Sequence, residues 1–368
     1  MKAKRFILFF TINLSVLITV SAQQEIQLTH YIINPFMSNP AYSSIADFIN
    51  LKAGYRNQWN GIEGSPVTSY ASIHTPIGKP HWARTHPGDF HDWHGTGLFF
   101  LKDQIGPYNT TKVNLNYSYN LKIIEGGKYG YEHKDGLRIS FGTFVGWTQY
   151  NTDKALLSRS KVSDWSNVRN DLSVNDPTYL ILAENSTPTL DLTLGTMIYY
   201  NDRYFLGLTT SQIFQNEVSL GIDTKLIRHY FLNGMIKLPL WEHWYLIPST
   251  MVKLVRGAPT SFDFSTRLDW EDRFFIGGGY RYQDAVTFIA GLRYKWGEKI
   301  KNFRVDKHRY IVQFYYSYDL TVNRLASKNL LQKSRGTHEI TVGFLLPPMY
   351  TERNAEDTWK GWPGKRRN

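Results

Sequence analysis

The sequence contains no cysteine. This absence excludes a disulfide scaffold, thiolate zinc sites, iron–sulfur clusters and a cysteine nucleophile. It also excludes a lipoprotein, whose lipid is carried by a cysteine. The 368 residues are 42% hydrophobic, which indicates a globular chain that buries a large core. Aromatic residues make up 15% of the chain, and its many Tyr and Trp side chains suit a surface that is apolar on one side and wet on the other.

Long apolar runs are also lacking after residue 23, so the sequence predicts no transmembrane helix there. Before that point, three basic residues among the first five precede an apolar run at 6–20 and a small residue at 22. This layout predicts a secretory signal peptide at 1–22, and an N-terminal membrane anchor is the alternative. A secreted chain without apolar helices can still cross a membrane as a closed β-barrel.

Apolar and polar residues alternate through most of the chain, as in the apolar series Val113, Leu115, Tyr117, Tyr119 and Leu121. This period of two places one apolar and one polar face on each strand, and no comparable stretch has the helical period. The pattern predicts about fourteen strands, at 48–59, 66–76, 95–104, 110–123, 136–149, 187–200, 203–212, 224–238, 244–256, 259–269, 272–282, 285–296, 306–319 and 336–346. Short connections such as Asn201-Asp202 predict tight hairpin turns.

The fold class that we predict is all-β, a transmembrane antiparallel up-and-down barrel of about 14 strands with a C-terminal periplasmic extension. The strands are longer than soluble ones, their number is even, and aromatic residues gather at their ends. A secreted soluble sandwich or propeller is the alternative, although no repeat of about 40 residues supports a propeller. If both termini are periplasmic, the long connections 150–186, 213–223 and 320–335 face outward, as outer-membrane barrels require. The connections 77–94 and 297–305 are long for periplasmic turns.

One polar cluster raises the possibility of a metal site. His86, Asp89, His91 and His94 lie in a turn, but their spacing matches no metal signature, so we expect a polar loop and no metal or other cofactor. No nucleophile or zinc motif supports an enzyme. The net charge of +11 would suit nucleic acid, but the secreted location argues against such a partner.

Five ordered stretches resemble the PorP/SprF family, which comprises outer-membrane barrels of the type IX secretion and gliding machinery of Bacteroidota. They are LTHYIINPFMSNPAY (28–42), GYRNQWNGIEGSPVTSYASIHTPIG (54–78), GGYRYQDAVTFIAGLRY (278–294), YSYD (316–319) and GTHEITVGF (336–344). The residues that carry the family pattern are Asn39, Pro40, Ala41, Tyr55, Arg56, Trp59, Gly64, Pro66, Tyr318, Asp319, His338 and Glu339. Two departures are Ser43-Ser44, where the family often has glycine, and a chain that continues beyond the last strand.

The resemblance implies a non-enzymatic protein of the cell outer membrane, with both termini periplasmic. Its partners would be other type IX secretion components, namely a periplasmic ring lipoprotein or ring proteins. An exported gliding adhesin and outer-membrane lipid or lipopolysaccharide are further candidates. The alternatives are an accessory barrel for adhesin export or anchoring, and a passive porin.

We therefore divide the chain into four parts: a signal peptide (1–22), a periplasmic or plug segment (23–47), the barrel (48–346) and a periplasmic tail (347–368). The plug interpretation rests on the apolar anchors of residues 28–36, which precede the first strand. The tail combines aromatic and basic residues typical of interfaces. Its candidate partner-binding residues are Trp359, Trp362, Lys365, Arg366 and Arg367.

Overall fold

The computed structural model of the chain describes residues 28–79, 92–124, 136–153, 187–218, 224–271, 273–296, 310–322 and 334–346. Three 3-10 turns come first: η1 (Thr29–Ile32), η2 (Pro35–Met37) and η3 (Pro40–Ser44). The strands are β1 (Ile49–Asn57), β2 (Val67–Ile77), β3 (Trp93–Ile105), β4 (Tyr108–Ile124), β5 (Leu137–Thr152), β6 (Thr187–Tyr200), β7 (Tyr204–Ser211), β8 (Glu217–Val218), β9 (Thr224–Lys225), β10 (His229–Ile236), β11 (Leu238–Trp241), β12 (Trp244–Val255), β13 (Ser261–Trp270), β14 (Phe274–Arg281), β15 (Ala285–Trp296), β16 (Tyr310–Thr321) and β17 (Thr337–Leu346). No helix among these residues is long and apolar enough to cross a membrane.

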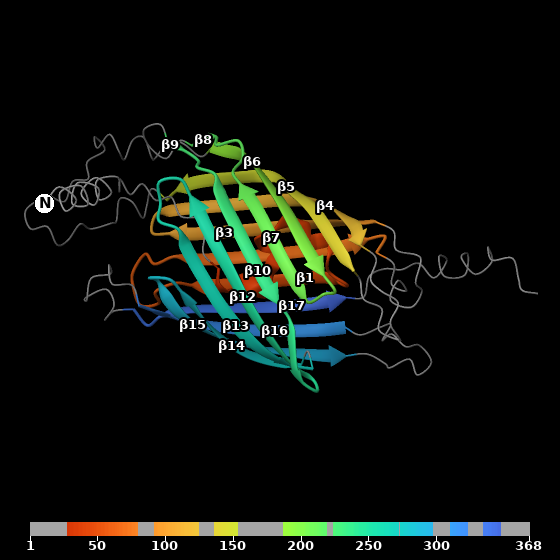
Figure 1. The fold of residues 1–368 in the computed structure, drawn as a ribbon. Coiled ribbons are helices and arrows are strands. Elements are labelled where there is room, and N and C mark those ends of the chain that lie inside the picture. The colour runs from red at the N-terminus through yellow and green to blue at the C-terminus, as the bar shows by residue number, and fades with distance from the viewer. Residues whose placement is uncertain are drawn as a thin grey trace, which may run out of the picture.

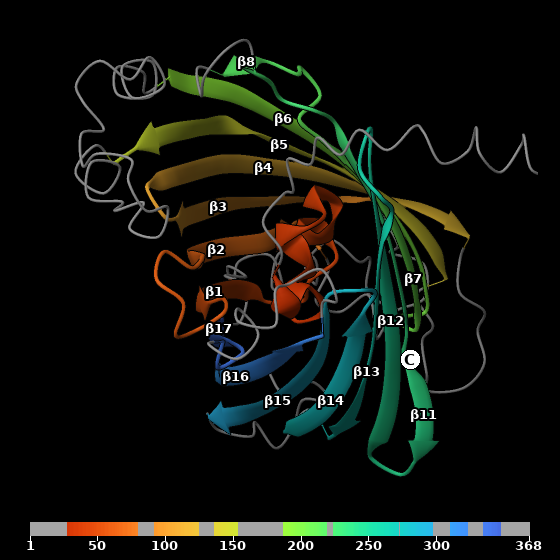
Figure 2. The same cartoon turned by 90° about the vertical axis from the view of Figure 1, so that its left-hand side faces the viewer.

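The strands close into one antiparallel barrel (Figures 1 and 2). Strands β1 to β7 pair in chain order, and so do β12 to β17. β17 returns to pair with β1, and β10 closes the ring by pairing with both β7 and β12. The ring has fourteen positions because β8 and β9 form a separate small hairpin and β11 extends the line of β10 along β12. The predicted all-β barrel of fourteen antiparallel strands is confirmed.

One predicted strand is divided in the structure. The segment 224–238 gives two residues to β9, and the barrel strand β10 begins only at His229. The tight turns agree with the prediction, because Asn201 and Asp202 have φ angles of 51° and 52°. Two consecutive positive φ angles define the type I′ turn that matches the twist of a hairpin.

The two ends of the barrel differ in their connections. We call the end at which the chain enters β1 and leaves β17 the turn mouth. The short turns at 201–203, 242–243 and 271–273 lie there, together with the longer connections 78–92, 125–136 and 297–309. We call the opposite end, where the 58–66 and 322–336 connections lie, the loop mouth. Because the strands alternate in direction, this assignment follows from the strand order alone.

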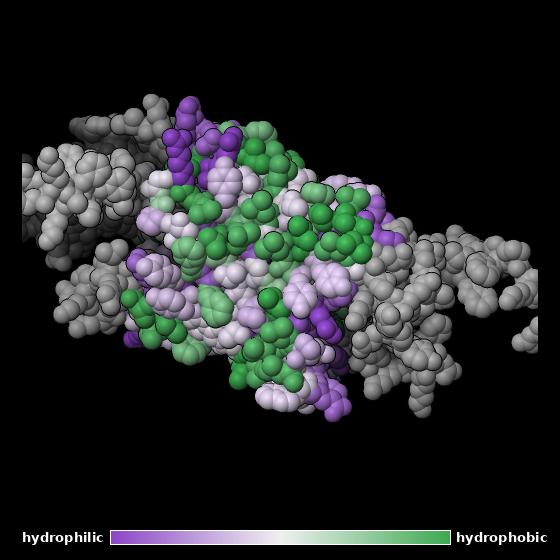
Figure 3. Space-filling view, viewed as in Figure 1, coloured by the Kyte–Doolittle hydropathy of each residue, from purple (hydrophilic) through white to green (hydrophobic). Residues whose placement is uncertain are grey.

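The outer wall of the barrel is apolar. Leu115, Ile276 and Leu292 point away from the lumen and expose 65%, 59% and 63% of their surface. Apolar side chains cover much of the barrel face seen in Figure 3, with hydrophilic residues toward its edges. Continuous apolar surface of this extent is costly in water and suits the hydrocarbon region of a membrane.

The lumen is lined by the polar half of the alternation. Inward positions of β4, for example, carry Asn114, Asn116, Ser118 and Asn120, all buried. The wall is therefore polar inside and apolar outside, the reverse of a soluble β-sandwich. Residues 28–46 lie within this polar lumen and fill its centre (Figure 2).

Candidate functional site in the barrel lumen

The N-terminal segment 28–46, which we call the lumen segment, folds because of two Asn-Pro pairs. In η3, Asn39 is the N-cap, and its side-chain oxygen accepts a hydrogen bond of 2.9 Å from the N–H of Ala41. Pro40 follows at the first position of the turn, where the missing N–H costs nothing and the fixed φ angle favours the turn. Asn34 and Pro35 start η2 in the same order. Short local turns are thus encoded where no strand partner exists.

Three strand glycines make room for η3. A Cβ atom at Gly142 would lie 2.4 Å from the Ala41 nitrogen, and one at Gly95 would lie 2.4 Å from the Ser44 nitrogen. At Gly195 it would lie 2.3 Å from the Asn39 side-chain oxygen. These glycines sit in one row across the wall, since Gly142 pairs with Gly195 and Ser118 pairs with both Gly95 and Gly142. We call Gly95, Gly142 and Gly195 the glycine cradle.

Hydrogen bonds from the wall then satisfy the carbonyl groups of η3. Asn116 Nδ2 donates to the Pro40 oxygen at 2.9 Å, Ser140 Oγ to the Ala41 oxygen at 2.7 Å, and Trp93 Nε1 to the Ser44 oxygen at 2.6 Å. The hydroxyls of Ser43 and Ser118 bond each other at 2.7 Å, and those of Ser44 and Ser140 at 2.8 Å. The Ser43-Ser44 pair that departs from the family pattern is therefore fully buried and bonded to the wall.

A buried ionic cluster surrounds the start of η1, toward the loop mouth. Arg56 donates from Nη1 to Glu339 Oε2 at 3.0 Å and from Nη2 to Asp319 Oδ2 at 2.9 Å. Thr29 joins both carboxylates, through its N–H to Glu339 at 2.8 Å and through its hydroxyl to Asp319 at 2.7 Å. Arg281 also donates to the Thr29 hydroxyl at 3.3 Å. We call Arg56, Arg281, Asp319 and Glu339 the ionic cluster.

Its chemistry is that of a structural network. Every charged group has an opposite charge within 4 Å, and the wall supplies Asp263 and Asp284 as further partners for Arg281. Pairing of this kind is required for charges that are almost fully buried, because an unpaired buried charge is strongly unfavourable. The cluster holds the start of the lumen segment against the wall through Thr29.

His30 lies beside this cluster and is buried. Its Nδ1 is 2.6 Å from the Thr341 hydroxyl and 3.3 Å from Glu339 Oε1. Burial lowers the pKa of His30 below 6.5, since it penalises the charged imidazole more than Glu339 stabilises it. His30 is accordingly neutral at pH 7, and this neutral state is the one that fits the lumen.

The predicted family-pattern residues separate into four places. Arg56, Asp319 and Glu339 converge in the ionic cluster, and Asn39, Pro40 and Ala41 form the start of η3. Three others face outward near the loop mouth, where His338 Nδ1 bonds the Tyr316 hydroxyl at 2.8 Å; they are Tyr55, Tyr318 and His338.

The last three lie in the β1–β2 connection. Trp59 has φ 52° and donates its N–H to the Thr337 hydroxyl at 3.1 Å. Gly64 has φ 72°, which favours glycine, and its oxygen accepts from the Gly106 N–H at 2.9 Å. The oxygen of Pro66 accepts from Gln58 at 2.9 Å. These bonds tie the connection to β17 and to the β3–β4 turn.

The remaining candidates are only partly placed. His94 lies in β3 and faces outward, with its Nδ1 2.8 Å from the Tyr117 hydroxyl. His86, Asp89 and His91 lie outside the described residues, as do the signal peptide and the tail residues Trp359, Trp362, Lys365, Arg366 and Arg367. Among the described residues, no group of three or more His, Asp or Glu side chains could hold a metal ion.

Sequence reasoning missed several residues of the lumen site. Arg281 is part of the ionic cluster, and Thr29 bonds to it. The glycine cradle makes room for η3. One signal was available: Gly95, Gly142 and Gly195 interrupt their strands at positions of inward parity. Glycine inside a strand indicates close approach of another backbone, but the approaching segment is not evident from the sequence.

A comparison with known protein families distinguishes the membrane barrel from the secreted soluble sandwich or propeller. Residues 20–344 match the model of the family described as type IX secretion system membrane protein PorP/SprF. The chain belongs to the PorP/SprF family. The match includes the lumen segment, the ionic cluster and all strands of the barrel except the last two residues of β17. Membership and the apolar outer wall together support a non-enzymatic outer-membrane barrel of type IX secretion.

Solved structures with similar chain paths are remote in sequence. The toluene transporter TbuX of Ralstonia pickettii is 10% identical, with 85% of this chain and 92% of that chain covered and a TM-score of 0.46. A FadL homologue of Pseudomonas aeruginosa is 9% identical, with 84% and 92% covered and a TM-score of 0.43. BamA of Haemophilus ducreyi lacking POTRA domains 1–3 is 9% identical, with 81% and 70% covered and a TM-score of 0.35. No curated protein sequence matches this PorP/SprF member.

Proposed function

We propose that this PorP/SprF member anchors the periplasmic complex of the type IX secretion machinery to the outer membrane. The observation that supports the proposal is that the lumen of this barrel is filled by the chain's own residues 28–46, because a filled barrel suits docking better than permanently open transport. The occupied lumen disfavours a passive porin. An accessory role in export or anchoring of a surface adhesin remains the alternative, and the periplasmic partners would be ring lipoproteins or ring proteins.

We assign the docking surface to the turn mouth and to the tail, residues 347–368. The tail follows Leu346, where β17 leaves the barrel at the turn mouth, so it starts on the same side as both ends of the barrel sequence. Pro347 and Pro348 prevent continuation of the strand. Trp359 and Trp362, with the basic residues near them, are of the types most enriched at binding hot spots.

The test is purification from native membranes in mild detergent, followed by mass spectrometry. Full-length protein is compared with protein truncated after Leu346 and with a full-length Trp359→Ala/Trp362→Ala variant. We expect periplasmic type IX components with the full-length chain and their loss, by about tenfold or more, from both variants. A Glu63→Ala variant at the loop mouth is the control and should retain them.

Heat-modifiable migration on gels confirms that each variant keeps a folded barrel. Equal recovery of ring components with all four proteins would exclude the tail as the docking element. Recovery of a surface adhesin alone would favour the accessory role.

A further inference from the structure

The two parts of the lumen segment are held in different ways. The third turn, η3, lies against five consecutive strands, β2–β6, whereas η1 lies against β16 and β17. The glycine cradle fits the backbone of η3 closely, and wall side chains satisfy its carbonyl groups. Withdrawing η3 would leave these donors and acceptors unpaired and would expose a row of glycines. It is therefore the fixed part.

The ionic cluster does not depend on η1. Arg56 bonds Asp319 and Glu339 directly, and Arg281 bonds Asp284 and lies 3.4 Å from Asp263. All of these residues belong to the wall or its connections. If Thr29 left, each charge would keep an opposite charge, so the usual penalty for breaking a buried ion pair would not arise.

Several polar atoms between η1–η2 and the wall have no hydrogen-bond partner among the described residues. They include His30 Nε2, Asn34 Oδ1 and both ring nitrogens of His74, whose ring stacks on Phe36 of η2. On the wall beside η3, Asn116 Oδ1 is in the same state, whereas the side chains of η3 contribute no such atom within the described residues. Withdrawal of η1–η2 would give these buried groups water as a partner, which lowers the cost of separating the two surfaces.

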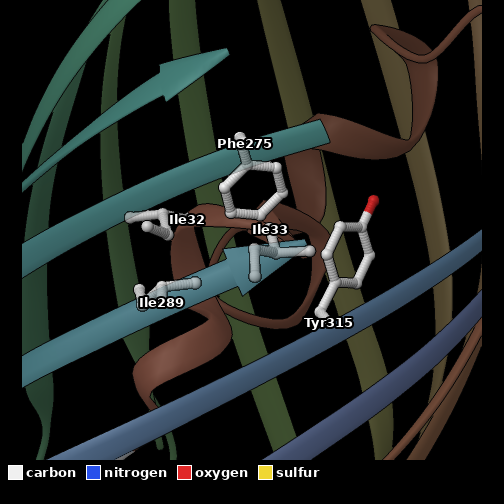
Figure 4. Close-up of a cluster of buried hydrophobic side chains, with 5 residues drawn as sticks. All are labelled: Ile32, Ile33, Phe275, Ile289 and Tyr315. Atoms are coloured by element: carbon white, nitrogen blue, oxygen red, sulfur yellow. The ribbon is translucent and has the colours of Figure 1, made fainter. Parts of the chain in front are cut away.

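An apolar contact holds η1 in place. Ile32 and Ile33 pack against Phe275 of β14, Ile289 of β15 and Tyr315 of β16 (Figure 4). Two wall cations bond the carbonyl groups of the same residues, Arg267 at 3.2 Å and Lys52 at 2.5 Å. This contact lies across the lumen from the glycine cradle. Its loss would separate η1 from the wall while η3 stayed seated.

We propose that residues 28–38 form a gate that leaves the lumen while η3 remains in the glycine cradle. Two apolar contacts keep the gate closed: that of Ile32 and Ile33, and that of Phe36, which is fully buried in a cluster with Tyr70, Phe99, Leu101 and Phe144. The path that opens is lined by the polar inward face of the barrel, so it conducts inorganic ions and small hydrophilic solutes. Apolar solutes gain nothing from such a wall. The gate is closed at rest, so it differs from the permanently open lumen of a passive porin, and its opening would leave the turn mouth and the tail as the docking surface.

The absence of native cysteine permits a direct test by cross-linking in planar bilayers. Asn34 Nδ2 lies 2.9 Å from Ser72 Oγ, and an Asn34→Cys/Ser72→Cys variant ties the gate to β2 through a short bis-methanethiosulfonate, whose two disulfide links are cleaved by reduction. Ser43 Oγ lies 2.7 Å from Ser118 Oγ, and Ser43→Cys/Ser118→Cys ties η3 to β4 in the same way. Full-length protein and both variants are compared before cross-linking, after it and after reduction.

We expect voltage-induced openings in potassium chloride that the first cross-link abolishes, that reduction restores, and that the second cross-link leaves unchanged. Ile33→Ser should raise the open fraction about tenfold or more. Heat-modifiable migration excludes misfolded barrels. The proposal is wrong if both cross-links block openings equally, if neither does, or if wild type and Ile33→Ser are both silent.

Discussion

Arg56 and Glu339 are 283 residues apart in the chain and form a 3.0 Å ion pair inside the lumen. The pair joins β1 to β17 across the closure of the barrel, where Arg56 and Glu339 are also register partners. Asp319 extends it to β16, and Thr29 attaches the lumen segment to the same two carboxylates. The Arg56 guanidinium group therefore connects the β1–β17 closure of the barrel to the lumen segment.

Removing that guanidinium should destabilise the barrel strongly. In Arg56→Ala, the Asp319 and Glu339 carboxylates lose their shared partner while remaining buried. Breaking a buried pair from one side costs about 3–5 kcal/mol, and we expect the free energy of unfolding in detergent or vesicles to fall by that amount. Urea titration followed by tryptophan fluorescence measures it.

The control is the ion pair between Lys225 and Glu217, whose side chains are 66% and 70% exposed. A Lys225→Ala change there should cost about 0–1 kcal/mol, because water screens an exposed pair. Comparable decreases in the free energy of unfolding of Arg56→Ala and Lys225→Ala would mean that the lumen around Arg56 is open to bulk water.

The sequence was sufficient to predict the wall. Each strand has one face toward the lipid and one toward the polar lumen, so apolar and polar residues alternate along strands such as β4. This alternation made both the positions and the number of the barrel strands predictable. Arg56, Asp319 and Glu339 were also identified, as parts of a family pattern. Their convergence was not predictable, because the register between residues 283 positions apart, such as Arg56 and Glu339, depends on closure of the ring.

The lumen segment was harder to interpret. Its apolar anchors predicted a plug or a periplasmic segment, but its turns carry no period, and the wall that receives it is built from strands that follow it. The Asn39-Pro40 pair encodes the turn locally. Its binding place depends on Gly95, Gly142 and Gly195, which come together only when β3–β6 are in register. The Asn39-Pro40 pair therefore predicts the turn itself, whereas the position of that turn in the lumen depends on the assembled barrel.

A single added methyl group in the cradle should unseat η3. Gly142→Ala places a Cβ atom 2.4 Å from the Ala41 nitrogen, a backbone atom that cannot yield without moving the turn. Overpacking of this kind costs about 1–3 kcal/mol, and we expect a persistent ion leak measured as conductance in planar bilayers.

Gly234→Ala is the matched control, because the nearest atom to an added Cβ there is Thr250 Cγ2 at 3.6 Å, an ordinary contact. That variant should conduct like the wild type. A conductance of Gly142→Ala equal to that of the wild type would show that η3 adjusts within the cradle.

Acid should loosen the start of the lumen segment through His30. The docked imidazole has a pKa lowered by burial, whereas an undocked imidazole titrates near 6.5. Undocked His30 therefore takes up a proton at a pH where docked His30 does not, so docking weakens as the pH falls below 6.5 and is complete above it. Glu339 and Asp319 oppose the shift, and Arg56 and Lys52 add to it.

The measurement uses a single cysteine at Leu28, in a chain that has no other. Its labelling by a water-soluble methanethiosulfonate, corrected for thiolate fraction, should be faster at pH 5.5 than at pH 7.5. In a His30→Gln background, the pH dependence should disappear. Its persistence there would assign the effect to the carboxylates of the ionic cluster.

The outer wall makes the last prediction, which concerns the solvent around the barrel. Leu115 and Ile123 both face outward on β4, with 65% and 50% of their surfaces exposed, but Leu115 lies near the middle of the strand and Ile123 at the turn mouth. In a membrane, Leu115→Arg should cost about 2–4 kcal/mol and Ile123→Arg about 0–1, because a charge is tolerated only near the interface. Urea unfolding in lipid vesicles measures both.

The depth dependence separates a membrane barrel from a secreted soluble one. In water, both side chains would already be hydrated, and an exposed substitution at either site would change stability by only about 0.5 kcal/mol. A difference of about 2 kcal/mol or more between two exposed positions on one strand has no source in the protein's own packing. It must come from the hydrocarbon that surrounds Leu115, and equal costs at the two positions would place the barrel in water.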